Sequence, residues 1–316
     1  MTRLIVVSAT FLLFTSIDSQ TARADDQNDA SPQSVLVNTL WLQDHLSSPL
    51  VRILELGPDI RQFREGHIPG AQFVHWIDDI TEPTDRARYT VAPPKMIEAL
   101  LCRLGIQNQT TIVLYDDLNS RVSARMFWTL RYFGHKDIRI LDGGRRAWSR
   151  AGQALAPSSD LNESAEPTKY KIVSRVKKHR IRLKQVRKHL EHTDVSIIDA
   201  RAPAQYAGEQ PGTVYHTGKP HAQLGHIPGA VNILWKENFR ADGTFKSVDK
   251  LQQLYEQNGV NPERKVITYC NEGLHAAPPW FVLTELLGYH NVHLYDESMA
   301  EWANNSNLPI RVGDQP

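Results

Sequence analysis

The hexapeptide Gly-His-Ile-Pro-Gly-Ala occurs twice in this chain, at residues 66–71 and again at 225–230. Downstream of it, the two halves align at a constant offset of 154 residues, with the identical pairs Gly105 and Gly259, Tyr115 and Tyr269, Phe127 and Phe281, Gly134 and Gly288, Asp142 and Asp296, and Trp148 and Trp302. An internal repeat of this kind indicates duplicated structural units, so we expect two homologous domains. The length of 316 residues, about twice that of a common single domain, agrees with this expectation.

A polar stretch rich in chain breakers separates the two copies. Residues 156–168 contain two prolines, three serines and several acidic or amide side chains, which is typical of a linker. The predicted organisation is therefore a first domain over residues 25–155, a linker over 156–168 and a second domain over 169–316.

The first 24 residues have the pattern of a secretory signal peptide. A positive start at Arg3 precedes an apolar run over residues 4–14 and the small-x-small sequence at 22–24. We expect cleavage after Ala24 and a mature protein that is periplasmic or secreted. The apolar run is shorter than the roughly 18–20 residues that cross a bilayer, so an uncleaved anchor is the less favoured alternative and no membrane association is expected after cleavage.

Composition and charge exclude several functional classes. Lys and Arg number 36 against 35 Asp and Glu, so no net field attracts nucleic acid. Hydrophobic residues make up 41% of the chain, which is enough for a packed core without disulfide staples. The two cysteines, Cys102 and Cys270, form no Cys-x-x-Cys motif, so zinc ribbons and thioredoxin-type redox sites are not expected.

Each copy alternates short β-branched runs with amphipathic helical segments. The expected strands end at Glu55 and Asp199 or cover residues 111–115, 138–141, 266–269 and 292–294, and the expected helices cover 96–104 and 248–255. This alternation predicts an α/β fold with two tandem domains, each a mostly parallel sheet flanked by helices. Ligands of such sheets bind at the carboxyl ends of strands, which directs attention to the loops after Tyr115 and Tyr269.

The loop after Tyr269 carries a cysteine. Cys270 begins the sequence Cys-Asn-Glu-Gly-Leu-His-Ala, and a helix is expected to begin near residues 277–279. A tight loop that leads into a helix N-terminus directs backbone N–H groups toward the sulfur and favours the nucleophilic thiolate over the thiol. The alternative for Cys270 is a small buried hydrophobic residue. For Cys102, on the apolar face of the 96–104 helix, that structural role is the favoured one.

These motifs together resemble one known family. The repeated hexapeptide, Asp-Ala-Arg at 199–201, Tyr-Cys-x-x-Gly at 269–273, and Leu-Tyr-Asp at 294–296 followed by Glu301-Trp302 are similar to those of the rhodanese family of sulfurtransferases in its tandem two-domain form. The resemblance extends over nearly all of the mature chain. It identifies the chain as similar to exported thiosulfate or 3-mercaptopyruvate sulfurtransferases.

The resemblance implies a mechanism and a set of site residues. The active-loop cysteine, here Cys270, takes a sulfane sulfur from thiosulfate, 3-mercaptopyruvate or a persulfide and passes it as a persulfide to a thiophilic acceptor, with no metal or organic cofactor. Asp116 stands at the position of Cys270 in the first copy and cannot carry sulfur, so the first domain is implied to be inactive. The residues implied to bind substrate are Asn271, Glu272, Gly273, Leu274, His275, Ala276 and Arg201.

A phosphatase is disfavoured by the loop itself. Phosphatases of the same topology use Cys-x5-Arg, in which the arginine binds phosphate. The sixth residue after Cys270 is Ala276, so the phosphate-binding arginine is missing.

The loop also departs from typical thiosulfate enzymes of the family. Glu272 stands where a lysine is usual, and Gln205 stands where an arginine is usual. Thiosulfate is a dianion, so we expect it to bind poorly. His275 stands where the family usually has a residue with a hydroxyl group. It could hydrogen-bond to the donor or act as an acid or base, and the alternative is a side chain that faces solvent.

Other cations near the loop are Arg201, Lys219 and His221, the last two in a segment before Gly225 that is longer than its counterpart in the first copy. An internal ion pair with a carboxylate is the favoured interpretation of Arg201. His67 and His226 recur in both copies, including the one without an active-loop cysteine, so we expect them to stabilise turns by hydrogen bonding.

A basic run covers residues 175–188. A solvated face is its default interpretation, and a docking surface for an anionic protein partner is the alternative. For the whole chain, the rival to an enzyme is a non-catalytic rhodanese-like binding module that holds a thiol, a persulfide or a protein partner, because the usual cations are missing. The retained Cys270 favours the enzyme.

Overall fold

The computed structural model describes residues 34–85, 87–157, 167–190, 192, 194–214 and 218–316. The predicted signal peptide and most of the predicted linker lie outside these ranges. Among the described residues, no helix combines the length and the apolar character that crossing a membrane requires.

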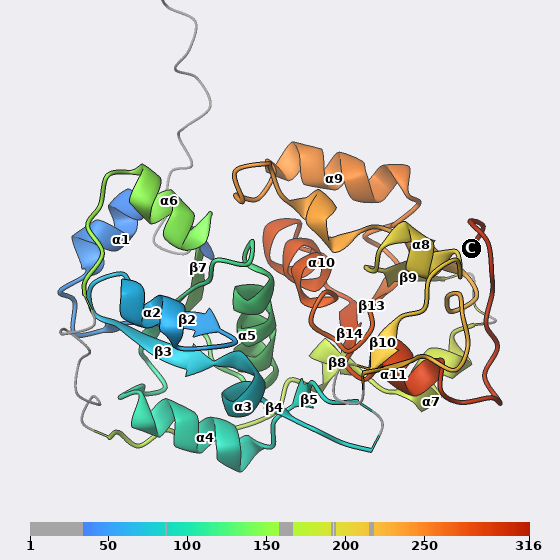
Figure 1. Cartoon of the computed structure of the whole chain (residues 1–316), viewed down its shortest axis with the longest axis horizontal. Helices are drawn as coiled ribbons and strands as arrows, with labels where there is room; N and C mark the ends of the chain where they lie inside the picture. Colours follow the sequence, from blue (N-terminus) through green and yellow to red (C-terminus); the bar gives the residue numbers. More distant parts are fainter. Residues whose placement is uncertain (1–33, 86, 158–166, 191, 193, 215–217) are drawn as a thin grey trace, which may run out of the picture.

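The first domain is a five-stranded parallel sheet in the order β1-β7-β6-β2-β3. Helices lie on both faces of the sheet (Figure 1). Its strands are β1 (Leu36–Val37), β2 (Val51–Gly57), β3 (Ala71–His75), β6 (Thr111–Tyr115) and β7 (Ile138–Leu141). Its helices are α1 (Thr39–His45), α2 (Arg61–Glu65), α3 (Trp76–Ile80), α4 (Pro94–Arg103), α5 (Arg121–Tyr132) and α6 (Gly144–Arg150), and a small hairpin is formed by β4 (Thr81–Glu82) and β5 (Thr90–Val91).

The second domain repeats this architecture in the order β12-β9-β13-β14-β8, again with every pair parallel. Its main strands are β8 (Arg180–Ile181), β9 (Val195–Asp199), β12 (Ala230–Asn232), β13 (Lys265–Tyr269) and β14 (Val292–Tyr295), and β10 (Thr213–Val214) pairs with β11 (Lys219–Pro220). Its helical elements are η2 (Lys177–His179), α7 (Leu183–Lys188), α8 (Pro203–Tyr206), η3 (Trp235–Asn238), α9 (Val248–Gln257), α10 (Ala277–Phe281), the π-helical turn η4 (Val282–Leu286) and α11 (Ser298–Trp302). The predicted fold class is confirmed.

The repeated hexapeptide has the same structural role in both domains. The tyrosine that ends the central strand accepts a hydrogen bond from the hexapeptide isoleucine, Ile68 N to Tyr115 Oη at 3.1 Å and Ile227 N to Tyr269 Oη at 3.2 Å. The hexapeptide thus ties the connection before the edge strand to the end of the central strand.

The histidines of the hexapeptide stabilise the same turns. Both bond through Nδ1 to a backbone carbonyl, His67 to Phe63 at 3.1 Å and His226 to Tyr206 at 2.8 Å, and both stack on the ring of that residue. The expectation that these histidines hold turns is confirmed.

The segment that enters the second domain crosses the first one. We predicted the second domain to begin at residue 169, but residues 168–172 hydrogen-bond to α4 and to the loop that follows it. The second sheet begins only at β8. Cys102 of α4 lies under this segment, half-buried against the core, with its sulfur 3.3 Å from the backbone nitrogen of Tyr170.

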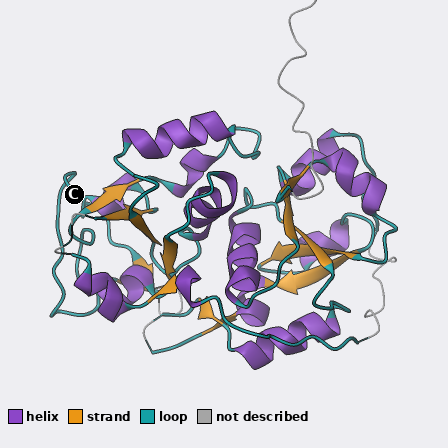
Figure 2. Cartoon of the chain, turned by 180° about the vertical axis from the view of Figure 1, so that it is seen from behind, coloured by secondary structure: helices purple, strands orange, loops and turns teal. Residues whose placement is uncertain are grey.

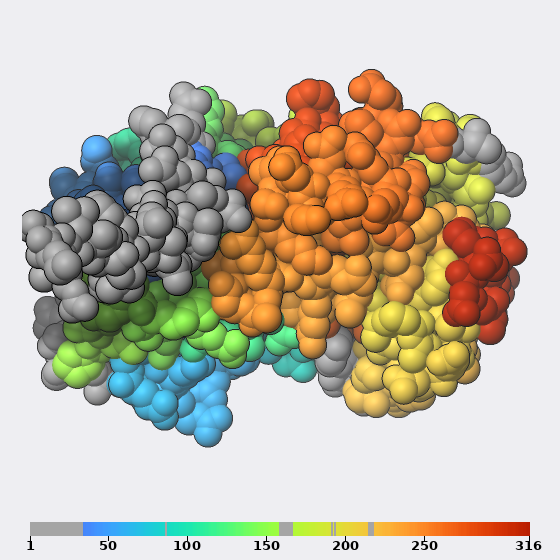
Figure 3. Space-filling view, turned by 90° about the horizontal axis from the view of Figure 1, so that it is seen from above, coloured from blue at the N-terminus to red at the C-terminus, as the bar shows by residue number. Residues whose placement is uncertain are grey.

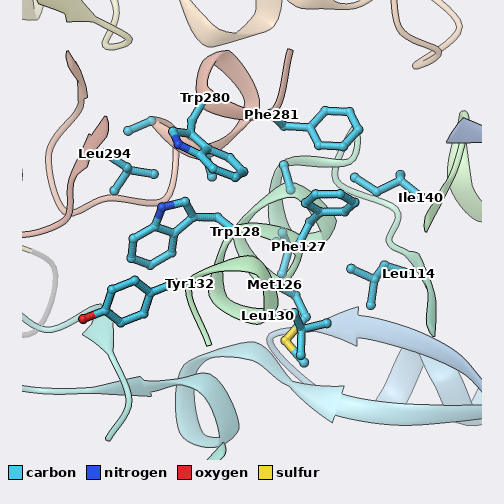
Figure 4. Packing of buried hydrophobic residues seen from close by; sticks show 14 of the residues in the cluster. Leu114, Met126, Phe127, Trp128, Leu130, Tyr132, Ile140, Trp280, Phe281 and Leu294 are labelled. Carbon is cyan, nitrogen blue, oxygen red and sulfur yellow. The ribbon is translucent and has the colours of Figure 1, made fainter. Parts of the chain in front are cut away.

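One hydrophobic cluster extends across both domains, and each domain has a further cluster of its own. The equivalent helices α5 and α10 pack against each other, with the Phe127 and Phe281 rings 4.8 Å apart at 79° (Figure 4). Figure 2 shows these helices side by side between the two sheets. Trp128 and Trp280 are also fully buried there. In each domain the loop after the central strand leads directly into this helix. The packing of α5 against α10 therefore brings both loops to the domain interface.

Candidate active site

Cys270 lies at the carboxyl end of β13, with only 2% of its surface exposed. The loop curls around it as expected, since the backbone amides of Glu272, Gly273, His275 and Ala276 hydrogen-bond to its sulfur. Burial nevertheless raises the pKa of the Cys270 thiol, because the loss of hydration outweighs the four amides. The expected loop of amides is present and favours the thiolate, but the expected net preference for the thiolate is wrong, because burial outweighs the amides.

Gly273 is the tight point of this loop. Its φ of +79° is in the left-handed region, and a Cβ at this position would lie 2.6 Å from the backbone oxygen of Asp296. Only glycine therefore allows the loop to turn here without displacing the end of β14.

The first domain contains the counterpart of this loop, filled by its own carboxylate. Asp116 accepts hydrogen bonds from the backbone amides of Leu118, Ser120, Val122 and Ser123 at 2.7–3.0 Å, and another from the Ser123 hydroxyl at 2.9 Å. An acidic side chain thus occupies the place of the sulfur. The comparison shows that this loop geometry is suited to an anion, and that the first copy has no nucleophile at that point.

Glu272 faces the first domain rather than the sulfur. Its side chain is buried, and Oε1 accepts a hydrogen bond from the backbone nitrogen of Arg88 at 3.0 Å. Arg88 belongs to residues 81–85 and 87–91, here called the interdomain arm, which extends from the first domain across the active loop (Figure 1). The sequence identified the unusual charge of Glu272 but could not show where it points.

A buried ion-pair network joins this arm to the loop. Arg125 of α5 pairs with Asp296 at 2.6 Å and donates to the backbone oxygens of Gly273 at 3.3 Å and of Tyr89 at 2.8 Å. Asp296 also pairs with Arg180 at 2.9 Å and accepts from the backbone nitrogen of Val91. These two arginines hold the pKa of the Asp296 carboxyl below its usual range despite burial.

His275 does not simply face solvent. Its half-buried ring stacks on Trp235, with centroids 4.9 Å apart at 14°, and Nε2 lies 3.2 Å from Nη1 of Arg121 in the first domain. Burial, followed by the charges of Arg121 and Lys236, lowers the pKa of His275 to about 3. The ring is therefore neutral near pH 7, and because Arg121 can only donate, Nε2 accepts and the proton is assigned to Nδ1.

Arg201 forms the internal ion pair that we favoured from the sequence. Its guanidinium pairs with Asp199 at 2.6 Å and donates to the backbone oxygen of Gly225 at 2.8 Å, fully inside the second domain. His221, another candidate cation, is buried, and its pKa is lowered to about 4, chiefly by desolvation. It is neutral near pH 7, so its expected role as a cation is wrong. Lys219 is exposed on β11.

Asn271 of the loop contacts the long segment that precedes the second hexapeptide. Asn271 is buried and donates through Nδ2 to Oε1 of Gln205 at 3.2 Å, while its Oδ1 has no partner. Leu274 is half-buried and Ala276 is buried. Hence Gln205 contacts the loop as a neutral hydrogen-bonding group where an arginine is usual.

The basic run at 175–188 is only partly a solvated face. Arg180 is an internal residue that pairs with Asp296 and Glu297, and the exposed Arg182 also pairs with Glu297. The exposed cations of the run are Arg175, Lys177, Lys178, Arg182, Lys184, Arg187 and Lys188.

Two rhodanese-like domains match the chain, at residues 38–151 and 182–305. The chain therefore belongs to the rhodanese-like family, in a form with two tandem domains. It is 38% identical over 284 residues to the sulfur carrier protein TtuD of Thermus thermophilus, covering 89% of this chain and 98% of that protein. It is 33% identical over 289 residues to a thiosulfate sulfurtransferase of Corynebacterium glutamicum, covering 90% and 92% of the two chains.

Among solved structures, the 3-mercaptopyruvate sulfotransferase SseA of Escherichia coli superposes with a TM-score of 0.70 at 26% identity, over 84% of this chain and 98% of that one. Wild-type EanB superposes with a TM-score of 0.77 at 21% identity, over 88% and 69% of the two chains, and shows likeness of fold. These comparisons confirm the predicted family and the prediction of a sulfurtransferase enzyme.

Proposed function

We propose that this protein transfers sulfane sulfur through a persulfide on Cys270. The Cys270 thiolate attacks the transferable sulfur of the donor and forms an S–S bond with it. The bond between that sulfur and the rest of the donor breaks, S–S in thiosulfate or a persulfide and C–S in 3-mercaptopyruvate, and its electron pair leaves with sulfite, a thiolate or the pyruvate enolate. A thiophilic acceptor then attacks the terminal sulfur with its own electron pair, and the Cys270 thiolate leaves. No net oxidation or reduction by an outside reagent is needed.

The ring of four backbone amides around the Cys270 sulfur carries this proposal. Both the attacking thiolate and the persulfide are anions, and preorganised amides stabilise such charge without reorganising during the reaction. In the second domain the Cys270 sulfur lies at the position that the Asp116 carboxylate occupies in the first domain.

The donor is proposed to be thiosulfate, 3-mercaptopyruvate or a persulfide. The relatives include proteins named thiosulfate sulfurtransferase, and a structural neighbour is named as a 3-mercaptopyruvate sulfotransferase. Glu272 and Gln205 in place of cations favour donors of lower charge than the thiosulfate dianion.

Export is proposed from the pattern of residues 1–24, with the mature enzyme periplasmic or secreted. Sequencing the N-terminus of the protein recovered from a fractionated culture tests this proposal. A start at Asp25 outside the cytoplasm supports it, and an intact Met1 in the cytoplasm contradicts it. The exposed cations at 175–188 are a proposed surface for an anionic protein partner.

Intact-mass analysis tests the sulfur-carrier function directly. The full-length protein is exposed separately to thiosulfate, 3-mercaptopyruvate and a low-molecular-weight persulfide, and any added mass is located by peptide mapping. A gain of one sulfur atom on Cys270 that disappears on addition of cyanide supports the enzyme. No gain from any of the donors would instead identify a binding module.

A further inference from the structure

We propose that Arg121, from the first domain, binds the anionic end of the sulfur donor beside Cys270. It would supply across the domain interface the positive charge that the active loop lacks. This proposal rests on the sulfur-transfer function above and names the residue that recognises its donor. The donor class it implies carries a carboxylate or sulfonate oxyanion near the transferable sulfur, because a guanidinium binds the planar or trigonal oxygens of such groups through two N–H donors.

Arg121 is a half-buried cation that has no acidic partner among the residues that the structure describes. It is the first residue of α5, and its Nε is buried without a hydrogen-bond partner. Within the described part of the chain, the contacts of its guanidinium are His275 Nε2 at 3.2 Å and the face of Trp235, whose ring centroid lies 5.6 Å from Cζ. Neither contact carries a negative charge. Partly buried charges are normally paired, so this guanidinium is suited to an anion supplied by a ligand.

The guanidinium is connected to the sulfur through a single residue. The backbone N–H of His275 hydrogen-bonds to the Cys270 sulfur, while the ring of the same residue reaches Arg121. Because the His275 ring is neutral and accepts at Nε2, it positions the guanidinium without cancelling its charge. A donor whose sulfane sulfur meets Cys270 can therefore place its oxyanion toward Arg121.

The surroundings favour this side of the loop for an anion. Lys236 lies on the same aromatic ring, with Nζ 5.8 Å from the Trp235 centroid, and both cations act on His275. The acidic loop residue Glu272 accepts a hydrogen bond from the backbone of Arg88 in the interdomain arm. Arg121 and Lys236 together therefore give the His275 side of the loop a positive field that favours an anionic donor.

The test measures how fast Cys270 gains sulfur from donors with and without an oxyanion group. Full-length wild type, Arg121→Gln and Arg121→Lys are compared with 3-mercaptopyruvate, thiosulfate and 2-hydroxyethyl persulfide, which has no carboxylate or sulfonate, by stopped reactions and intact mass. Arg64→Gln is the control, because it removes an exposed arginine from α2 of the same domain. Thermal unfolding of each variant monitors the fold.

Arg121→Gln should slow loading from the two donors with an oxyanion group about tenfold or more, the factor expected for one charged hydrogen-bonding contact, and should leave loading from 2-hydroxyethyl persulfide within about twofold of wild type. Arg121→Lys should recover part of the loss, and Arg64→Gln should match wild type. Equal slowing for all donors would assign Arg121 a purely structural role and overturn the proposal, as would unchanged rates with the two donors that carry an oxyanion group.

Failure of the proposed function gives a different result. If no donor loads wild-type Cys270, the sulfur-transfer function is contradicted. The anion site at Arg121 is then tested by measuring binding affinity instead of loading rates. Calorimetric titration of Cys270→Ser with pyruvate and with sulfite should show affinity that the added Arg121→Gln substitution reduces about tenfold, and less so at high salt. Absence of that reduction would remove the anion site as well.

Discussion

Arg125 of the first domain and Asp296 of the second form a buried ion pair at 2.6 Å, with their side chains 1% and 0% exposed. The same arginine bonds to Gly273 of the active loop and to Tyr89 of the interdomain arm. The active loop is therefore supported by a cation from the domain whose own loop has Asp116 in place of the cysteine. This gives the first domain a physical role in the site.

Arg125→Gln should destabilise the protein and loosen the active loop. Removing one partner of a buried pair leaves an uncompensated charge, which costs about 3–5 kcal/mol; the remaining Arg180 contact places the expected loss near the lower end. Urea unfolding measures the stability, and intact mass measures sulfur loading of Cys270. Arg131→Gln is the control, since Arg131 lies on the same helix and pairs across the interface with Glu285 at 3.0 Å, away from the loop. Similar losses in both variants would contradict a specific role for Arg125.

The two cysteines should respond differently to the same substitution. Cys270→Ser should abolish sulfur loading, because serine cannot carry a sulfane sulfur. Cys102→Ser should retain nearly full activity, because Cys102 belongs to α4 and packs beneath residues 168–172, where it has a structural role. Loading and cyanide turnover are measured for both. An equal loss would mean that the cysteines act as a pair, which the two free thiols of the structure do not indicate.

The repeat made much of the fold predictable. Identical residues at the ends of the central strands, Tyr115 and Tyr269, bind the same position of the hexapeptide, so a local sequence match reflected a conserved contact within each domain. The position of Cys270 followed for the same reason, since a strand followed by a glycine-containing loop and a helix determines where the cysteine lies.

Contacts between the domains were not predictable in this way. The orientation of Glu272 depends on Arg88, and the role of Arg121 depends on His275, and these partners are far apart in the sequence. One signal was present: Arg125 lies within an otherwise mainly uncharged helix whose surrounding residues are buried. A charged residue in such a position usually indicates a buried partner. The raised pKa of Cys270 could not be predicted either. The loop sequence indicates that backbone amides surround the sulfur, but it does not indicate how deeply the thiol is buried.

Thiosulfate should be a poor donor, and Glu272 should be one reason. From the sequence alone, Glu272→Lys with Gln205→Arg would be the natural test, but the structure shows that both residues accept hydrogen bonds, from Arg88 and from Asn271. Glu272→Gln is sharper because it removes the charge and keeps an acceptor. It should increase loading from the thiosulfate dianion, mainly at low ionic strength, and change loading from 2-hydroxyethyl persulfide, which carries at most one negative charge, less. Efficient thiosulfate use by wild type, unchanged in the variant, would rule out this repulsion.

The domain interface should also be sensitive to pH through Asp142. Its Oδ1 accepts a hydrogen bond from the backbone nitrogen of Phe245 in the second domain at 2.9 Å, next to the contact between α6 and Asp242. In the view from above, the orange surface of the second domain adjoins the green surface of the first (Figure 3). Desolvation raises the pKa of Asp142 to about 6, although the Phe245 amide opposes the shift.

The folded state therefore keeps a proton on Asp142 that the unfolded chain releases near pH 4. Stability from this group is fully present below about pH 4 and is lost as the pH rises through 6, by up to about 3 kcal/mol. Asp142→Asn retains the acceptor for Phe245 and has no charge to bury, so its stability relative to wild type should increase between pH 4 and 6 and then level off. Urea unfolding across pH 4–8 measures this difference, and Asp44→Asn, at an exposed site on α1, controls for the loss of a charge. A difference between Asp142→Asn and wild type that stays constant from pH 4 to 8 would show that Asp142 does not titrate in this window.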